Sequence, residues 1–337
     1  MSSYIIEGGQ KLEGTVKISG SKNSSLPIIA ATILNAGKTT LYNVPNIQDT
    51  QMMYKILETL GGKIEKKNGK VKIDTSKIEK FEIPPELMHK MRSSVILAGA
   101  LLGRYKKAIF SYPGGCDIGS RPIDLHLKSF EKLGIEANQN HGNIECKAEK
   151  IKGEKIDLDF PSVGATENAI LASVLAEGTT TIYNAACEPY IQQLCKMLNA
   201  MGAKISGIAS NLITIEGVKE LHSADHRILP DMIEVGSFIG IAAMIGDGVR
   251  IKEVSVPNLG LILDTFRRLG VQIIEDGDDL LIPRQDHYVI DSFIDGTIMT
   301  ISDAPWPGLT PDLISVLLVV ATQAQGSVLF HQKMFES

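Results

Sequence analysis

Several residue types that would narrow the function of this chain are scarce. The 337 residues include one tryptophan and four cysteines. The cysteines are Cys116, Cys146, Cys187 and Cys195, and they form neither a Cys-x-x-Cys pair nor a Cys/His spacing suited to a metal. The sequence therefore indicates no zinc site and no disulfide framework, and no metal is expected.

Long apolar runs and clusters of positive charge are missing as well. The longest apolar runs, near 239–245 and 313–321, are too short to span a bilayer, and residues 1–7 are unlike a secretory signal peptide. The formal net charge is −5, and no group of lysines and arginines forms a nucleic-acid surface. We expect a cytoplasmic protein whose partners are small molecules, not a membrane or a nucleic acid.

The chain does contain an internal repeat, with a spacing of roughly 70 residues. A helical pattern ends on an apolar residue and a glycine at Leu60-Gly61, Leu133-Gly134, Met201-Gly202 and Leu269-Gly270. Each glycine is expected to end a helix, and a pair of strands follows it. The complete unit is predicted to be strand–helix–strand–helix–strand–strand.

The first helix of each unit is apolar on nearly all sides, which is typical of a buried helix. This pattern predicts an α/β protein with helices inside and sheets outside, in place of a doubly wound sheet. The length of the chain favours two domains.

The repeat brings unusual residues to equivalent helix starts. These starts contain Ser21-Lys22-Asn23, Met91-Arg92-Ser93, Ser162-Val163-Gly164, Pro230-Asp231 and Thr310-Pro311-Asp312. Helix N-termini suit phosphate and carboxylate ligands, because their N–H groups have no partner within the helix. We expect Lys22, Arg92, Arg121 and Cys116 to line one cleft; for each cation alone, a solvated surface charge is the alternative.

The segment Pro113–His126 combines three glycines with Cys116, Arg121 and two carboxylates. Glycine lets the backbone approach a ligand closely, and a nearby arginine can lower the pKa of a thiol for acid–base or nucleophilic chemistry. A helix is expected to begin at Pro122, since proline is well tolerated at the first helical position. The alternative is a tight turn with an incidental cysteine.

These motifs resemble the enolpyruvyl transferase family, and within it the branch that acts on UDP-N-acetylglucosamine. The resemblance covers the whole chain, and the cysteine loop followed by Arg121-Pro122 and Asp124-Leu125-His126 is its most specific part. The sister branch that acts on shikimate phosphate lacks this loop. The resemblance implies two inside-out α/β barrel domains of βαβαββ units, one formed by residues 1–21 and 230–337 and one by residues 22–229, which carries Cys116.

The resemblance also implies an activity that needs no cofactor. The enolpyruvyl group of phosphoenolpyruvate moves to the 3′-hydroxyl of UDP-N-acetylglucosamine and phosphate is released, which is the first committed step of peptidoglycan synthesis. By resemblance, Cys116 is the general acid or nucleophile, Asp312 is the base, and Lys22, Asn23 and Arg121 hold phosphoenolpyruvate. The residues implied to hold the UDP-sugar are Asn23, Arg92, Arg121, Pro122, Ile123, Asp124, Leu125, Ser162, Val163, Gly164, Asp312 and Met334.

Some positions depart from the usual family pattern, and two alternatives follow from them. The order Thr310-Pro311-Asp312 and the residues Ile96, Cys187 and Met232 are uncommon there, so an enolpyruvyl transferase with a different acceptor remains an alternative. The fifth repeat is incomplete at Ser337 and a sixth is absent. We therefore expect the natural product to continue for roughly 80 residues, and an inactive UDP-sugar-binding fragment is the other alternative.

Overall fold

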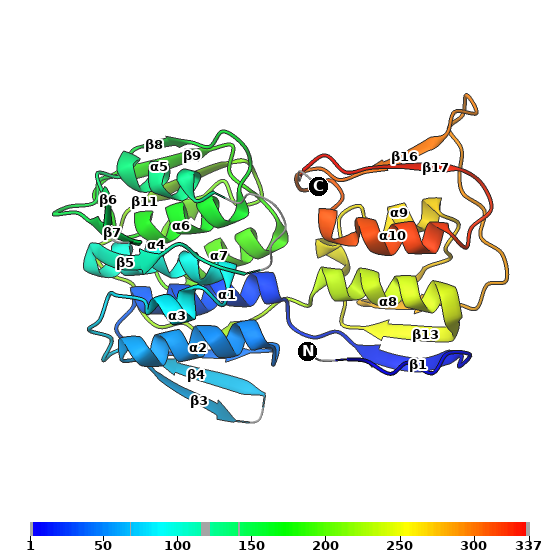
Figure 1. Cartoon of the computed structure of the whole chain (residues 1–337), viewed down its shortest axis with the longest axis horizontal. Coiled ribbons are helices and arrows are strands. Elements are labelled where there is room, and N and C mark those ends of the chain that lie inside the picture. Colours follow the sequence, from blue (N-terminus) through cyan, green and yellow to red (C-terminus); the bar gives the residue numbers. More distant parts are fainter. Residues whose placement is uncertain (1–2, 68, 116–121, 141, 335–337) are drawn as a thin grey trace. The chain divides into compact units, whose positions relative to one another are not determined.

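The computed structural model describes residues 3–67, 69–115, 122–140 and 142–334. The chain divides into two compact units (Figure 1). One unit contains the residues up to Ser19 together with those from Pro230 on, and the other is Gly20–Leu229.

Three sheets belong to the Gly20–Leu229 unit. The first has the order β8 (Lys155–Asp157), β9 (Thr179–Tyr183), β11 (Leu212–Glu216), β10 (Lys204–Ser206). The second has the order β12 (His226–Arg227), β2 (Lys38–Tyr42), β4 (Lys70–Asp74), β3 (Lys63–Lys67). The third has the order β5 (Lys107–Ser111), β7 (Asn143–Lys147), β6 (Glu136–Asn140).

The helices of this unit lie between its sheets, as Figure 1 shows. The first helices of the repeats are α1 (Lys22–Ala31), α4 (Ile96–Tyr105) and α6 (Val163–Ser173). The second helices are α2 (Gln48–Leu60), α5 (Asp124–Lys132) and α7 (Pro189–Ala200), and the short turns are η1 (Thr32–Leu34), α3 (Pro85–Met88) and η2 (Arg92–Val95). Residues 24–31 of α1, 96–103 of α4 and 165–173 of α6 are all buried, so the predicted inside-out arrangement is confirmed.

The other unit has two sheets and three α-helices among the residues described. One sheet has the order β1 (Leu12–Lys17), β13 (Gly246–Lys252), β15 (Asp279–Ile282), β14 (Ile274–Asp276), and the other pairs β16 (Met299–Ser302) with β17 (Val328–His331). The helices are α8 (Met232–Ile245), α9 (Ile262–Arg268) and α10 (Ile314–Ala321), with the turns η3 (Val256–Asn258) and η4 (Pro311–Leu313). In Figure 1 these helices lie between the two sheets.

All three four-stranded sheets share one topology. Each begins with a strand that is parallel to its neighbour: β8 to β9, β12 to β2, and β1 to β13. That neighbour pairs antiparallel with one strand of the following hairpin, and the other hairpin strand is at the far edge of the sheet. In one sheet, β8 to β11 follow each other along the chain. In the other two the first strand comes from far away in the sequence, since β12 joins β2 and β1 joins β13.

The four glycines predicted to end the second helices share one backbone geometry. Gly61, Gly134, Gly202 and Gly270 have φ values of 111°, 80°, 103° and 88°. In each case the residue after the glycine donates its N–H to a carbonyl five residues earlier, as Ile135 does to Phe130 at 3.0 Å. This is the Schellman motif, which turns the chain out of the helix into the following hairpin.

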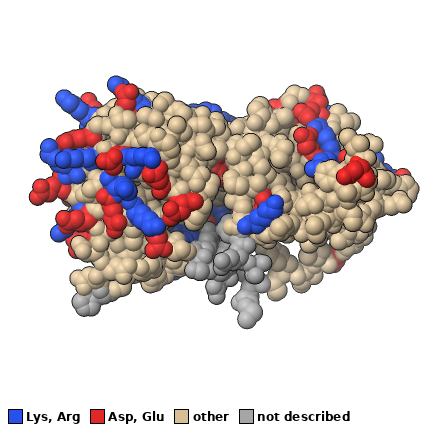
Figure 2. Space-filling model, turned by 90° about the horizontal axis from the view of Figure 1, so that it is seen from above, with Lys and Arg blue, Asp and Glu red and all other residues tan. Residues whose placement is uncertain are grey.

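Helices α8 and α10, which lie in the unit that contains the two ends of the chain, are less completely buried than α1, α4 and α6. On α8 the side chains of Ile241 and Met244 are exposed, and on α10 those of Leu318 and Val319 are exposed. The face of this unit seen in Figure 2 is mostly uncharged, whereas positive and negative side chains alternate over the Gly20–Leu229 unit. Within the described residues, α10 therefore leaves part of its apolar surface exposed.

The Schellman glycines predict a graded loss of stability on substitution by alanine. Gly134→Ala places a Cβ in open space, its nearest neighbour being Lys150 O at 3.8 Å, so only the left-handed backbone opposes it, at about 1–2 kcal/mol. Gly61→Ala adds a Cβ at 2.5 Å from Lys77 O, and relieving this overlap costs roughly 1–3 kcal/mol more. Urea unfolding of both variants tests this; because both sites lie in one unit, equal losses would contradict it.

Candidate active site

The start of α1 presents Lys22 and Asn23 after a capped turn. Ser21 is the N-cap residue, and its Oγ accepts a hydrogen bond from Ser24 N at 3.3 Å. Lys22 is half exposed, with its Nζ 3.9 Å from Asp49 Oδ2 at the start of α2. An exposed ion pair at this distance contributes little to stability.

The described part of the cysteine loop packs on the residues before η2. A Cβ added to Gly114 would lie 1.8 Å from His89 O, and one added to Gly115, whose φ is 115°, would lie 3.1 Å from the Arg92 Cβ. These two glycines therefore allow close approach to the protein's own chain, and close approach of the loop to a ligand stays a prediction. Cys116 and Arg121 lie outside the described residues.

The predicted helix start at Pro122 is wrong. Helix α5 begins at Asp124 after Ile123 as N-cap residue, and Pro122 lies one residue further back. Its carbonyl oxygen accepts a hydrogen bond from Arg92 Nη2 at 3.1 Å. The guanidinium of Arg92 thereby joins η2 to the segment that enters α5.

Helix α6 begins close to α5. Ser162 is the N-cap residue and accepts from Ala165 N at 3.4 Å, and Val163 and Gly164 follow it. A Cβ added to Gly164 would lie 3.1 Å from Cε1 of His126 in α5. The predicted residues Asp124 and Leu125 in α5 and Ser162, Val163 and Gly164 in α6 are thus at two neighbouring helix starts.

In the other unit, Asp312 lies in η4 directly after Pro311, at the helix start predicted for it. Its side chain is exposed, and its Oδ2 is 3.4 Å from the hydroxyl of Thr310, which can donate to it. Two other acids near a helix start already accept hydrogen bonds: Asp231 from Ile233 N at 2.9 Å, and Glu234 from Ser19 N at 3.0 Å. Among these three residues, Asp312 is the most exposed.

Sequence reasoning missed Asp303. This carboxylate is 1% exposed, and its two oxygens accept from Lys333 N at 2.6 Å and from Met334 N at 3.2 Å. It therefore fixes the backbone that carries Met334, one of the predicted sugar-nucleotide residues. No motif marks Asp303, because its partners lie 30 and 31 residues away along the chain.

Two glutamates near the start of α7, the buried Glu167 and the partly buried Glu188, were also not assigned a role. Burial, and then the nearby Glu188 carboxylate, raise the pKa of Glu167 well above its usual value. Burial likewise raises the pKa of Glu188, whose Oε2 has no hydrogen-bond partner among the described atoms. These carboxyl groups can hold protons at pH values where surface carboxylates are ionised.

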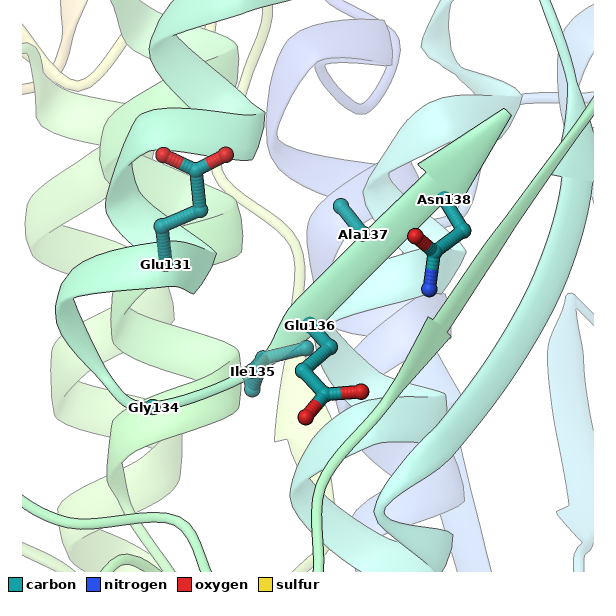
Figure 3. A pocket seen from close by; sticks show the side chains of 6 residues that line it. All are labelled: Glu131, Gly134, Ile135, Glu136, Ala137 and Asn138. Atoms are coloured by element: carbon teal, nitrogen blue, oxygen red, sulfur yellow. The ribbon is translucent and has the colours of Figure 1, made fainter.

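Two cavities lie on the Gly20–Leu229 unit, and one of them includes the predicted residue Leu125. One, of about 430 Å³, is lined by Glu131, Gly134, Ile135, Glu136, Ala137 and Asn138 at the end of α5 (Figure 3). The other, of about 240 Å³, is lined by Leu125, Lys128, Ser129, Glu131, Lys132, Ile156, Asp157 and Leu158. A helix C-terminus with two carboxylates disfavours an anion, and neither cavity is lined by Lys22 or Arg92, so the predicted common cleft remains a prediction.

Within the described ranges, no helix is both long and apolar enough to cross a membrane. No group of three or more metal-ligating side chains occurs in that part of the chain either.

Comparison with known proteins places these features in a family. The family model described as EPSP synthase (3-phosphoshikimate 1-carboxyvinyltransferase) matches residues 6–337. Relatives named UDP-N-acetylglucosamine 1-carboxyvinyltransferase are 52% identical in Bacteroides fragilis and 47% identical in Treponema denticola. In both cases the match covers 100% of this chain and 79% of the relative.

Solved structures agree on the fold. The enolpyruvyl transferase NikO from Streptomyces tendae superposes with a TM-score of 0.85 at 23% identity, covering 97% of this chain and 76% of that chain. EPSP synthase from Acinetobacter baumannii superposes with a TM-score of 0.70 at 18% identity, covering 97% and 75%. The family model and the relatives at about half identity together show that this chain belongs to the EPSP synthase family of enolpyruvyl transferases, in the branch of the UDP-N-acetylglucosamine 1-carboxyvinyltransferases.

Proposed function

We propose that this chain transfers the enolpyruvyl group of phosphoenolpyruvate to the 3′-hydroxyl of UDP-N-acetylglucosamine in the cytoplasm, with release of phosphate. The observation that carries the proposal is the 52% identity, over the whole chain, to a relative with that name. The cysteine loop supports it, because the branch that acts on shikimate phosphate lacks this loop. The two compact units are proposed to be the two catalytic domains.

The anionic substrate requires fixed cations and donors. We assign Lys22, Asn23 and Arg121 to phosphoenolpyruvate, because charge-assisted hydrogen bonds are the strongest that a protein offers to phosphate and carboxylate. Arginine adds the option of a two-point contact. Lys22 is half exposed at the start of α1, where its ammonium can reach a ligand from solvent.

The sugar nucleotide is assigned to the two neighbouring helix starts and to three further positions. Pro122, Ile123, Asp124 and Leu125 precede or begin α5, and Ser162, Val163 and Gly164 begin α6. Apart from Pro122, which has no N–H, these residues offer backbone donors that suit a diphosphate. Arg92 would add a positive charge beside Pro122, and Asn23, Arg121, Asp312 and Met334 complete the proposed set.

The chemistry needs proton transfers that balance. A proton from the Cys116 thiol goes to the methylene carbon of phosphoenolpyruvate, while the sugar hydroxyl attacks the neighbouring carbon and gives its proton to Asp312. The Cys116 thiolate then takes a proton back from the new methyl group, the double bond re-forms, and phosphate departs with the proton that Asp312 held. As a thiolate, Cys116 can instead add to the same carbon as the sugar hydroxyl.

Phosphate release from phosphoenolpyruvate, with and without UDP-N-acetylglucosamine, tests this function on the natural gene product. Release that depends on this nucleotide is expected. Release with another acceptor alone would favour the different-acceptor alternative, and nucleotide binding without release would favour the inactive fragment.

The first prediction concerns the selectivity of Cys116. An epoxide phosphonate such as fosfomycin should alkylate Cys116 and spare the other thiols, because the thiolate is the reactive form. Burial raises the pKa of Cys146 and of Cys195 to about 12, and burial also raises the pKa of the partly buried Cys187. Peptide mapping by mass spectrometry locates the adduct, and Cys116→Asp, which keeps an acid without a sulfur nucleophile, should show none. An adduct on Cys187 would contradict the assignment.

The second prediction concerns the base. Asp312→Asn keeps the shape of the side chain and removes its proton-accepting charge, so turnover should fall about 10²–10⁴-fold, while calorimetric affinity for the UDP-sugar changes far less. Asp264→Asn is the matched control, since Asp264 is exposed on α9 and pairs with Arg267. Unchanged turnover in Asp312→Asn would move the role of base to another carboxylate, with Glu234 and Asp231 tested next.

A further inference from the structure

A buried polar cluster joins α4, α5 and α6 at the helix starts proposed to hold the sugar nucleotide. Its centre is Asn168 of α6, which is fully buried. The Asn168 Oδ1 accepts from Gly99 N at 2.8 Å, and its Nδ2 donates to Val95 O at 3.0 Å. The same Nδ2 is 2.7 Å from Nδ1 of His126 in α5. No role in the proposed reaction has so far been given to Asn168 or His126.

The partners of Asn168 determine where the proton of His126 lies. Gly99 N–H can only donate and Val95 O can only accept, so the amide oxygen must face Gly99 and the amide nitrogen must face Val95. The second N–H of the amide therefore points at His126 Nδ1, which must accept it. The imidazole is then the neutral tautomer whose proton is on Nε2.

Two further features keep this imidazole neutral. His126 is 6% exposed, and burial followed by the charge of Arg92 lowers its pKa to about 4. The titratable groups on the elements around it include Arg92 before α4, Asp124 on α5 itself and Glu167 on α6, and of these only Arg92 shifts its pKa. At neutral pH the Nε2–H is thus a fixed donor without a cationic charge.

This donor has no partner among the described residues, although its side chain is more than nine-tenths buried. It lies at the start of α6, since a Cβ on Gly164 would be 3.4 Å from His126 Nε2. The first turn of α6, the guanidinium of Arg92 and this N–H all favour an acceptor oxygen that carries negative charge.

We propose that His126 Nε2–H donates a hydrogen bond to a phosphate oxygen of the sugar nucleotide, and that Asn168 is the positioning residue that fixes His126 in this tautomer. The proposal rests on the proposed function, because it takes the nucleotide diphosphate as the ligand. Asn168 itself does not touch the substrate.

Nitrogen-15 NMR of the unmodified protein tests the tautomer directly. At neutral pH, His126 should show a proton on Nε2 and none on Nδ1, and it should not titrate above about pH 5, given a pKa of about 4. A proton on Nδ1, or a titration near the ordinary histidine pKa of about 6.5, would overturn the proposal.

Ligand titration of the same sample tests the hydrogen bond. UDP-N-acetylglucosamine and UDP should shift the His126 Nε2–H signal, whereas uridine, which lacks the phosphates, should not. Calorimetric binding of UDP-N-acetylglucosamine with an unchanged Nε2–H signal would overturn this inference alone. Absence of any binding would overturn the proposed function together with it.

Variants test the role of Asn168. Asn168→Asp replaces the donor facing Nδ1 by an acceptor, so the neutral imidazole should carry its proton on Nδ1 and leave Nε2 without one. UDP-N-acetylglucosamine should then bind about 10- to 100-fold more weakly, the range for one hydrogen bond to a charged group. Asn199→Asp is the matched control, because Asn199 also uses both ends of its amide, bonding Ile205 O and N at 2.8 Å each. A purely structural role for Asn168 would weaken folding in both variants and leave the His126 tautomer unchanged, which would overturn the proposal.

Discussion

The structure depends on helices that cannot be exposed on any side. The first helix of each repeat in the Gly20–Leu229 unit is buried along almost its whole length, from residues 24–31 in α1 to 165–173 in α6. Such a helix needs neighbours all around it, and sheets with one apolar face supply them from outside. As a consequence, backbones approach each other closely in the core: a Cβ on Gly99 would lie 2.6 Å from Asn168 O. This close approach puts a side-chain amide within reach of a neighbouring helix, so tight packing and the polar cluster have one cause.

Local patterns in the sequence were enough to predict the repeat and its inside-out character, but not the origin of every strand. The glycines at 61, 134, 202 and 270 are local signals, because only a left-handed residue ends a helix in this way. The pairing of β1 with β13 and of β12 with β2 spans most of the chain. Nothing in a two-residue strand such as His226–Arg227 indicates that it pairs with β2.

In the candidate site, too, some features follow from local sequence patterns and others do not. Helix starts at Lys22 and Pro311 follow from capping residues and proline, and the structure has both. The start at Pro122 was wrong because its carbonyl binds Arg92, a contact over 30 residues that no local pattern encodes. Asp303 and Asn168 were missed for a similar reason: each owes its character to burial and distant partners, and an isolated Asp or Asn in a sequence has neither. The assigned roles of Cys116 and Arg121 still rest on resemblance.

A buried network leaves little freedom in the placement of protons. In water an imidazole exchanges tautomers and charge easily, but in a tightly packed core each polar atom must match the donor or acceptor opposite it. Here two backbone groups, Gly99 N of α4 and Val95 O of η2, determine the orientation of one amide, and the amide determines which nitrogen of His126 carries a proton. The packing of the central helices therefore affects the chemistry at their ends, because a donor at the start of α6 is selected by backbone atoms of η2 and α4. A fold that packs its helices this tightly can in this way determine which nitrogen of an imidazole carries the proton.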